Sequence, residues 1–260
     1  LPILDVSHPV MESVYHQYFE EPRYRPSVIT AQRLAGGVLG RKTKAGFYNY
    51  DEEKKPSPLS SDAKFATNSI AINLENTPPV WVSPNAARRM QLLELLVKLG
   101  AKVETGQSPS LHALTLVAPL GWDVTTVAVF ERYDPARTVG IDLLFDDAIT
   151  KRRVIMGNPA VRPDMLAFAA ELFARDGKPV SAIRDSAGFV TQRVVATIVN
   201  IATDMCQQGI CSPKDLEVAV TLGLGYPMGP LAMGDLVGPT NVLEILFNMG
   251  TVYGDPRYRP

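Results

Sequence analysis

A six-residue repeat constrains the organisation of this chain more than any other feature. Residues 21–26 (EPRYRP) recur as residues 255–260 (DPRYRP), and a Glu/Asp exchange is the only difference between the two copies. Each copy follows a helix-compatible stretch that contains a Val-Tyr pair. Self-similarity of this kind indicates a duplicated structural unit. We therefore expect the chain to hold the back of one unit and the front of another, with different material between them.

The repeat and the composition of the stretches between its two copies predict four segments. Residues 27–51 end in a Phe-Tyr-Asn-Tyr run that suits an extended tail, and the stretch after it, rich in Glu, Lys, Pro and Ser, predicts a linker. No counterpart of residues 27–51 follows the second copy. The expected segments are the tail of a first helical domain (1–55), a linker (56–77), a degenerate α/β domain (78–184) and a second, truncated helical domain (185–260).

Short apolar runs alternate with helical spacing through the middle of the chain, which favours a mostly parallel, doubly wound sheet. Ser83, Pro84 and Asn85 are expected to cap the first helix. We expect strands over 80–82, 102–104, 114–117, 126–130, 138–145 and 179–183, and helices over 85–99 and 164–176.

Beyond Asp185 the pattern becomes helical. A broad apolar face predicts a helix over 188–208, and Ser212 followed by Pro213 is typical of a helix start. A further helix is expected to end at Met249, beginning at about residue 231 or 240.

Composition excludes several classes of protein. The net charge of −1 argues against a general electrostatic grip on nucleic acid or anionic lipid, and no apolar run is long enough to cross a bilayer. Cys206 and Cys211 are expected on different faces of one helix, so neither a disulfide nor a zinc site is predicted. We expect His8 and His16 to be partly exposed and His112 to lie in a loop. No metal-ligand spacing occurs.

Several stretches together resemble the 3-hydroxyacyl-CoA dehydrogenase family. Residues 185–193 (DSAGFVTQR) resemble its Asp-x-Pro-Gly-Phe-Ile-x-Asn-Arg junction between the nucleotide and helical domains, and residues 222–230 (LGLGYPMGP) resemble its Gly-x-Gly-Tyr-Pro-Met-Gly-Pro turn. Residues 21–26 and 39–51 resemble the tail of the same helical domain. The resemblance implies a degenerate, Rossmann-like α/β domain plus the family's all-α C-terminal helical domain.

The layout resembles bacterial members in which a complete N-terminal half precedes a decayed second half. The resemblance implies a parent enzyme whose NAD-binding domain lies upstream of Leu1 and which oxidises L-3-hydroxyacyl-CoA to 3-ketoacyl-CoA, in fatty-acid or related acyl-CoA β-oxidation in the cytoplasm. Helical domains of the family shape the acyl pocket and form a dimer or an intramolecular pseudo-dimer. Two alternatives stay open: a non-catalytic assembly module derived from a dehydrogenase, and a hydroxyacid dehydrogenase that does not use CoA esters.

The catalytic positions of the family are altered in this chain. Oxidation of a secondary alcohol needs a base, and the family pairs a His with a Glu for this purpose. By the resemblance Asp142 stands at the His position, Val154 near the Glu position, and Gln192 replaces the Asn of the junction. An unperturbed Asp has a pKa of about 4, so it is a poor base for an alcohol. We expect this part of the protein to contain no catalytic residue.

The cofactor fingerprint is also missing. A dinucleotide fold places Gly-x-Gly-x-x-Gly between its first strand and helix, where the backbone approaches the pyrophosphate. Residues 83–88 (SPNAAR) contain no glycine, and the glycine-rich stretches 36–40 and 223–229 have the spacing of turns. Proline flanks the Arg pairs of the two repeats, so a structural turn is expected at each, with its arginines bracing neighbouring helices or the partner unit. We therefore expect no binding of NAD, and none of metal, by this part of the chain.

Overall fold

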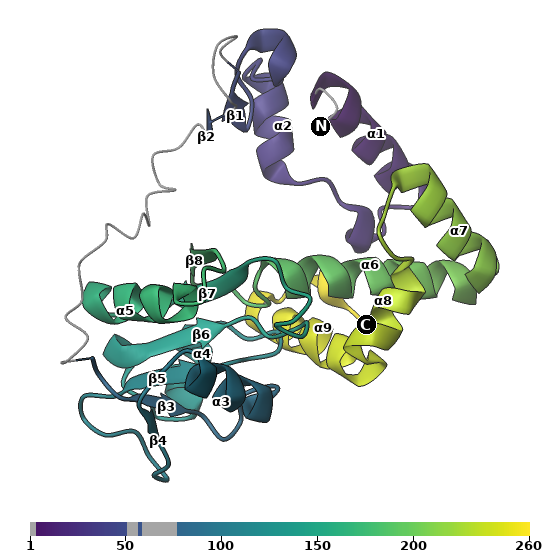
Figure 1. Ribbon diagram of the computed structural model, residues 1–260. Helices are drawn as coiled ribbons and strands as arrows, with labels where there is room; N and C mark the ends of the chain where they lie inside the picture. Colours follow the sequence, from purple (N-terminus) through teal and green to yellow (C-terminus); the bar gives the residue numbers. More distant parts are fainter. Residues whose placement is uncertain (1–3, 51–56, 59–76) are drawn as a thin grey trace. The chain divides into compact units, whose positions relative to one another are not determined.

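The computed structural model describes residues 4–50, 57–58 and 77–260, which fall into two compact units, Leu1–Ala66 and Thr67–Pro260 (Figure 1). Each unit is described by itself. In the larger unit the α/β part and the C-terminal helices have separate apolar cores. The predicted boundaries at residues 55, 77 and 184 stay a prediction.

The smaller unit is built on two helices, α1 (Leu4–Gln17) and α2 (Val28–Ala35). His8 of α1 is 2% exposed, and its Nδ1 lies 3.0 Å from the hydroxyl of Thr30 in α2. That hydroxyl itself donates to the Ser27 carbonyl (2.6 Å), so the His8 ring donates to it. The expectation of a partly exposed His8 was wrong, because the ring is enclosed where the helices meet; His16 is exposed.

The rest of the smaller unit is irregular. A 3-10 turn, η2 (Arg41–Thr43), precedes β1 (Tyr48–Asn49), which pairs antiparallel with β2 (Ser57–Pro58).

The two copies of the repeat fold into the same kind of 3-10 turn, η1 (Pro22–Tyr24) and η6 (Pro256–Tyr258). The carboxylate before each turn accepts from the arginine backbone two residues on: Glu21 from Arg23 at 3.4 Å, and Asp255 from Arg257 at 3.0 Å. Each arginine Nε also donates to that carboxylate, at 3.0 and 2.9 Å. Each copy of the repeat is therefore a structural turn, as predicted; the bracing of neighbouring helices by its arginines stays a prediction.

A six-stranded sheet forms the α/β part of the larger unit, in the order β4-β3-β5-β6-β7-β8. All neighbours are parallel except β6 and β7. The Rossmann-like fold class is confirmed, although the strand β7, which reverses direction, was not predicted. The strands are β3 (Val80–Val82), β4 (Val103–Glu104), β5 (Leu114–Val117), β6 (Thr138–Ile141), β7 (Arg153–Gly157) and β8 (Val180–Arg184).

Helices cover the two faces of the sheet unequally. α3 (Arg89–Lys98) and α5 (Pro163–Ala174) share one large apolar core with strand residues such as Leu116 and Ile155. Val117 and Met156, the next residues in the same strands, face the other side because side chains alternate along a strand. There the cluster contains α4 (Val124–Phe130), one short helix, with Tyr133 and Phe189, and Ser186 N donates to the Met156 sulfur at 3.1 Å. That face is therefore thinly covered.

α4 corrects the expectation of a strand over residues 126–130. The β-branched run was misleading because two carboxylates cap its first turn. Asp123 accepts from Thr126 N (2.6 Å), and Asp185 accepts from Val124 N (2.8 Å) and Thr125 N (3.1 Å). Capping of this kind outweighs a weak strand preference.

Four helices form the C-terminal part, around a core that contains Val195, Val199, Ile245 and Met249. The predicted Ser212 cap is confirmed, since its hydroxyl accepts from Asp215 N at 3.2 Å. The helix expected to start at 231 or 240 is two helices, α8 and α9. The four helices of this part are α6 (Val190–Gln207), α7 (Pro213–Leu224), α8 (Pro230–Val237) and α9 (Pro239–Tyr253).

The turn resembling the family's Gly-Tyr-Pro-Met-Gly-Pro sequence joins α7 to α8. Glu217 of α7 accepts from Leu231 N at 2.7 Å and so caps α8. A side chain at Gly229 would collide with the Glu217 carboxylate, 1.8 Å from its Cβ position. Cys211 lies beyond the end of α6, which corrects the expectation that Cys206 and Cys211 share one helix; both are free thiols.

Across the described ranges, no helix combines the length and the apolar character that a membrane span requires.

Candidate functional site

The crevice for a dinucleotide would lie at the carboxyl ends of β3 and β5. β3 pairs with β4 on one side and β5 on the other, so the order of the strands reverses there. Open α/β sheets bind their ligands at such a switch point, with a phosphate on the backbone N–H groups of the turn that follows the first strand.

The turn after β3 has closed upon itself. Ser83 N donates to the Leu116 carbonyl (2.9 Å) and Ala87 N to the Ala118 carbonyl (2.9 Å). Asn85 N donates to the Ser83 hydroxyl (3.1 Å), Ala86 N donates to the Ser83 carbonyl (3.1 Å), and Pro84 has no N–H. No backbone donor from 83 to 87 remains for a phosphate.

Two corrections belong to this turn. Helix α3 begins at Arg89, four residues after Asn85, and its N-cap is Arg88 in the left-handed conformation (φ 50°). We expected the Ser83-Pro84-Asn85 stretch to cap the helix. It does not, because the Ser83 hydroxyl is used inside the turn. The Asn85 amide donates to the Glu131 carboxylate at 2.6 Å, which adds a negative charge beside the turn.

Asp142 and Gln192 come together at the carboxyl end of β6. The Gln192 side-chain amide donates to Asp142 Oδ1 (3.0 Å) and to the Pro119 carbonyl (3.0 Å), and its oxygen accepts from Gly121 N (2.9 Å). Gln192 is fully buried. It ties α6 to the ends of β5 and β6 at once, a position in which its additional methylene is used.

The third family position lies in the same place. Asp142 N donates to the Val154 carbonyl at 2.9 Å across the β6–β7 pair. The structure thus brings together Asp142, Val154 and Gln192, which the resemblance had aligned with the family's His, Glu and Asn. Neither an imidazole nor a second carboxylate is among them.

The electrostatics of Asp142 follow from its surroundings. Removal of the carboxyl group from water raises its pKa, against hydrogen bonds from Gln192, the Leu144 amide and Thr191, which lower it. A raised pKa makes the group a better proton acceptor than an ordinary Asp. The histidines lie elsewhere: His8 and His16 in the smaller unit, and His112 exposed just before β5.

Arg153 is a residue whose role the sequence did not indicate. It is 2% exposed, and its guanidinium forms a double pair with Asp147 (2.8 and 2.8 Å) and another with Asp176 (2.7 and 2.8 Å). Lys178 also donates to Asp147, at 3.0 Å. Arg153 holds the pKa of both carboxyls below their ordinary range. This network fixes the segment between β6 and β7, where the family's catalytic His stretch would lie.

The family-like junction 185–193 is explained by packing. Asp185 caps α4, and Gly188 adopts φ 79° where an added Cβ would lie 2.3 Å from the Met249 sulfur. Phe189 is buried against the sheet. Arg193 donates to the Ala187 carbonyl (2.8 Å) and to the Tyr253 hydroxyl (2.7 Å). These residues join the sheet to helices α6 and α9.

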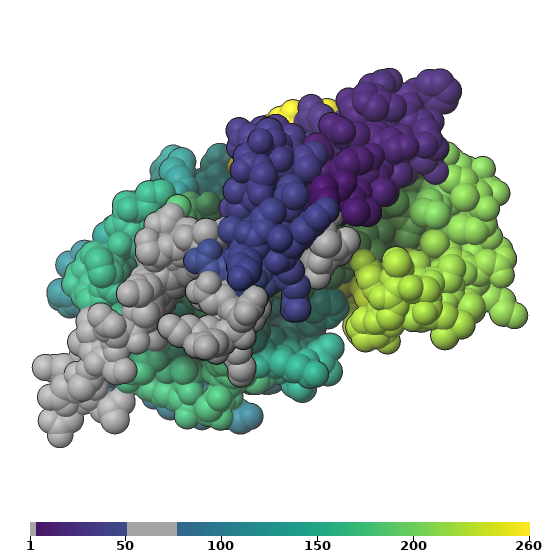
Figure 2. Space-filling view, turned by 90° about the horizontal axis from the view of Figure 1, so that it is seen from above, coloured from purple at the N-terminus to yellow at the C-terminus, as the bar shows by residue number. Residues whose placement is uncertain are grey.

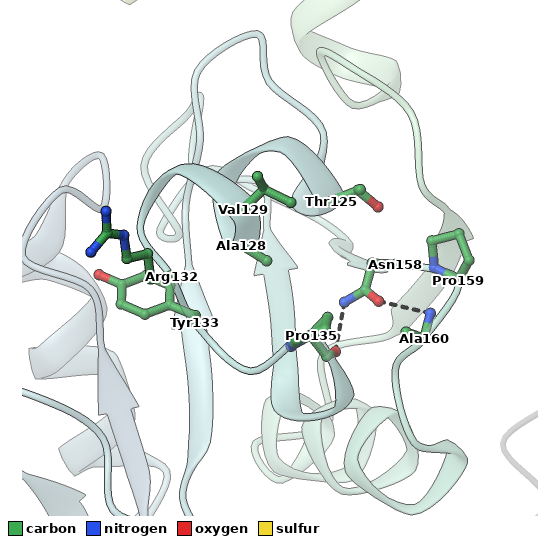
Figure 3. Close-up of a pocket in the computed structure, with 9 residues that line it drawn as sticks. All are labelled: Thr125, Ala128, Val129, Arg132, Tyr133, Pro135, Asn158, Pro159 and Ala160. Atoms are coloured by element: carbon green, nitrogen blue, oxygen red, sulfur yellow. Dashed lines mark hydrogen bonds between the residues drawn. The ribbon is translucent and has the colours of Figure 1, made fainter.

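A pocket of about 450 Å³ lies beside α4 (Figure 3). Asn158 lines the pocket, and its amide donates to the carbonyl of Thr138 at 3.1 Å. Thr138 is the first residue of β6, whereas Asp142 follows the last residue of that strand. It is lined by Thr125, Ala128, Val129, Arg132, Tyr133, Pro135, Asn158, Pro159 and Ala160. Within the described ranges, no group of His, Cys, Asp and Glu side chains could hold a metal.

Comparisons with known proteins agree with these features. Residues 3–50 and 188–260 match the family model described as 3-hydroxyacyl-CoA dehydrogenase, C-terminal domain. Over 98% of its length the chain is 28% identical to 3-hydroxyadipyl-CoA dehydrogenase of Escherichia coli (strain K12), covering 46% of that protein. It is also 28% identical to a probable 3-hydroxybutyryl-CoA dehydrogenase of Bacillus subtilis (strain 168), over 48% of this chain and 44% of that one.

Solved structures of similarly named proteins also match the chain. The chain is similar to 3-hydroxybutyryl-CoA dehydrogenase from Escherichia coli K12, with a TM-score of 0.69 and 25% identity, covering 99% of this chain and 47% of that one. For (S)-3-hydroxybutyryl-CoA dehydrogenase from Ralstonia eutropha the TM-score is 0.55 at 22% identity, covering 71% and 62%, which shows a shared fold. The chain spans about half the length of the curated relatives it matches.

Proposed function

We propose a function from the premise that the comparisons supply: the chain resembles the 3-hydroxyacyl-CoA dehydrogenase family, and 3–50 and 188–260 match that family's C-terminal domain. The chain is the C-terminal part of an NAD-dependent dehydrogenase that converts L-3-hydroxyacyl-CoA to 3-ketoacyl-CoA. It contributes to the acyl pocket and to assembly and carries out no catalysis itself. This division of roles between the chain and the rest of the enzyme is supported most directly by the turn after β3, where the backbone N–H groups from 83 to 87 already donate within the protein.

NAD does not fit the residues present in the α/β part. A pyrophosphate needs unengaged backbone donors at the turn after the first strand. Here the N–H groups of Ser83, Asn85, Ala86 and Ala87 already donate within the protein, and Glu131 adds negative charge. We therefore derive no step of the reaction through NAD bound to this domain, and assign the cofactor to a separate domain of the parent enzyme.

Acyl-CoA is the proposed substrate of the parent enzyme, in fatty-acid or related β-oxidation in the cytoplasm. The relatives named for 3-hydroxyadipyl-CoA and 3-hydroxybutyryl-CoA support a CoA ester over a free hydroxyacid. The alternative is an assembly module without catalysis in either half. The sequence of the other half distinguishes the two, because only an enzyme needs the glycine fingerprint and the His/Glu pair.

Assembly is proposed to use the helices of the two matched segments. α1 presents Val6, Val10 and Val14 along one exposed face, and α9 presents Leu243 and Phe247. Exposed apolar stripes of this length mark association surfaces. We propose that residues 1–50 pack on the 185–260 helices, within one chain or between two. Chemical cross-links between the two segments are expected; their complete absence, at any protein concentration, contradicts the proposal.

Calorimetry with NADH tests the division of roles. The 260-residue chain is expected to give no binding heat at micromolar NADH and no dehydrogenase turnover with 3-hydroxybutyryl-CoA. If turnover does occur and Asp142→Asn abolishes it, then Asp142 is catalytic and the proposal is wrong. Binding of NADH with micromolar affinity by the chain contradicts the assignment of the cofactor to another domain.

A further inference from the structure

The end of α6 brings the two cysteines of the chain together. Cys206 belongs to the last turn of α6, and the chain then reverses through Gly209, which has φ 71°. Gly209 N donates to the Cys206 carbonyl (3.1 Å) and Ile210 N donates to the Met205 carbonyl (3.0 Å), the paired bonds of a Schellman motif. Cys211 therefore returns towards the end of the helix instead of continuing along its axis.

The two thiol groups are neighbours. Removal from water, the adjacent Cys211 thiol, which hydrogen-bonds to Cys206, and the Glu217 carboxylate together raise the pKa of the Cys206 thiol. Both cysteines are free and half-exposed. The connection between α6 and α7 lies at the surface of the larger unit (Figure 1, Figure 2). Small reagents in solution can therefore reach the pair.

The connection that carries Cys211 is fixed at both ends. On one side is the Schellman motif, and on the other the Ser212 hydroxyl accepts from Asp215 N (3.2 Å) and donates to the Asp215 carboxylate (2.6 Å). Only four residues separate the two cysteines. A short, bonded connection keeps the second thiol close to the first, so a reaction within the pair is favoured over one with another molecule.

A metal site is not supported at this place. A structural zinc ion takes four protein ligands. Among the residues that the structure describes, no third His, Cys, Asp or Glu side chain joins the pair in a group that could hold a metal. The chemistry that two neighbouring thiols have in common is oxidation to a disulfide.

We propose that Cys206 and Cys211 form a redox-sensitive thiol pair, which a small-molecule disulfide oxidises to an intramolecular disulfide. In the first step the Cys211 thiolate attacks one sulfur of the small disulfide, whose S–S bond breaks and releases one thiol. In the second step the Cys206 thiolate attacks the Cys211 sulfur and displaces the other half as a second thiol. Two electrons pass from the protein to the small disulfide, and the two protein protons end on the released thiols.

The order of attack follows from the surroundings of Cys206. Its raised pKa keeps the proton on the thiol, whereas the thiolate is the attacking form. Cys211 is therefore assigned the first attack. The resulting bond links the end of α6 to the residue before the Ser212 cap of α7. This site does not include Asp142 or the turn after β3, so it stands or falls independently of the proposed dehydrogenase function.

Equilibration of the reduced 260-residue chain with mixtures of glutathione and glutathione disulfide tests the proposal. After acid quenching, mass spectrometry is expected to show a monomer lighter by two hydrogens, and peptide mapping is expected to join Cys206 to Cys211. The effective concentration of one thiol towards the other should be roughly millimolar or higher. The proposal is overturned if the oxidised chain carries glutathione on its cysteines or forms linked dimers instead, and equally if no oxidation occurs across the whole range of mixtures.

Cys206→Ser and Cys211→Ser are the matched variants, since each leaves one thiol in an otherwise unchanged connection. Both should stop at the mixed disulfide with glutathione, because no second thiol displaces it. Cys206→Ser, which keeps the attacking Cys211, should form its mixed disulfide faster than Cys211→Ser does. A wild-type chain that accumulates as much mixed disulfide as the two variants contradicts the closure of the pair.

Discussion

Two turns of the α/β part differ in what has happened to the motifs that the family places there. After β3, where a dinucleotide fold has its glycine fingerprint, residues 83–88 contain no glycine and the backbone donors from 83 to 87 bond within the protein. After β8, residues 185–193 keep a family-like sequence, and Asp185, Gly188 and Arg193 each make a contact that holds the fold together. The residues of the junction after β8 therefore serve packing, whereas those of the turn after β3 bond within the turn and to β5.

The same contrast applies to the segment between β6 and β7. By the resemblance, Asp142 stands at the family's catalytic His position; its carboxylate is tied to Gln192, and the following segment is fixed by Arg153. The side chains at these positions bond to one another. Four substitutions test whether these contacts carry the stability that the comparison assigns to them.

The largest effect is expected for Arg153→Ala. Removing the buried guanidinium loses four charge-assisted hydrogen bonds to the partly exposed Asp147 and Asp176 together with the packing of the Arg153 side chain, and a cost of about 3–5 kcal/mol is expected. Urea unfolding measures the loss. Arg162→Ala is the control, because the Arg162–Asp164 pair is exposed and such pairs contribute about 0–1 kcal/mol. Similar losses for the two variants contradict the importance given to the buried network.

Gly188→Ala sharpens the account of the junction. An alanine there must adopt a left-handed φ of 79° and places its Cβ 2.3 Å from the Met249 sulfur, so a loss of about 3 kcal/mol is expected. Gly177→Ala has a comparable φ of 83° with open space around the Cβ, and about 1 kcal/mol is expected from the backbone alone. The difference between the two measures the contact with α9; no difference refutes it.

Asp185→Ala tests the cap that joins the junction to α4. The carboxylate accepts from Val124 N and Thr125 N, and loss of an N-cap side chain costs about 1–2 kcal/mol. Hydrogen exchange should show faster exchange in 124–130 than in the unchanged chain. Asp185→Asn keeps one acceptor and should lose less; an equal loss in both variants points to charge as the main contribution instead.

The smallest effect is a pH dependence at Asp142. Its pKa in the folded state is raised, so the folded chain retains this proton above about pH 4, where the unfolded chain releases it. Stability from this group is complete below that pH and is lost as pH rises through the folded pKa. The stability of Asp142→Asn relative to the unchanged chain should therefore rise from pH 4 upward. A difference that stays constant with pH shows that the carboxyl is not desolvated.

Much of the architecture was predictable from local pattern. The strands at 80–82, 114–117 and 138–141, the helix from Pro163 and the Ser212 cap follow from apolar spacing and from capping chemistry, which act over a few residues. The paired 3-10 turns were predictable for the same reason, since each carboxylate bonds to an arginine two residues away.

Other features depend on partners far away in the sequence. Residues 126–130 form a helix because Asp185, about 60 positions on, caps it, and Arg153 is held by carboxylates 6 positions before it and 23 after it. His8 is enclosed because α2 packs over it. Local propensity does not contain such contacts, so these predictions failed or were not made.

By itself the sequence determined that this protein has a Rossmann-like sheet followed by a helical domain, and that residues 83–88 contain no glycine, because motifs and apolar periodicity are local properties of the chain. Only the tertiary structure decided how these segments bond to one another. Hydrogen bonds that join separate segments close the turn after β3 and hold Asp142 against Gln192. The pocket beside α4 also appears only in the folded chain, because the length of a helix and the fit of its neighbours are settled by packing.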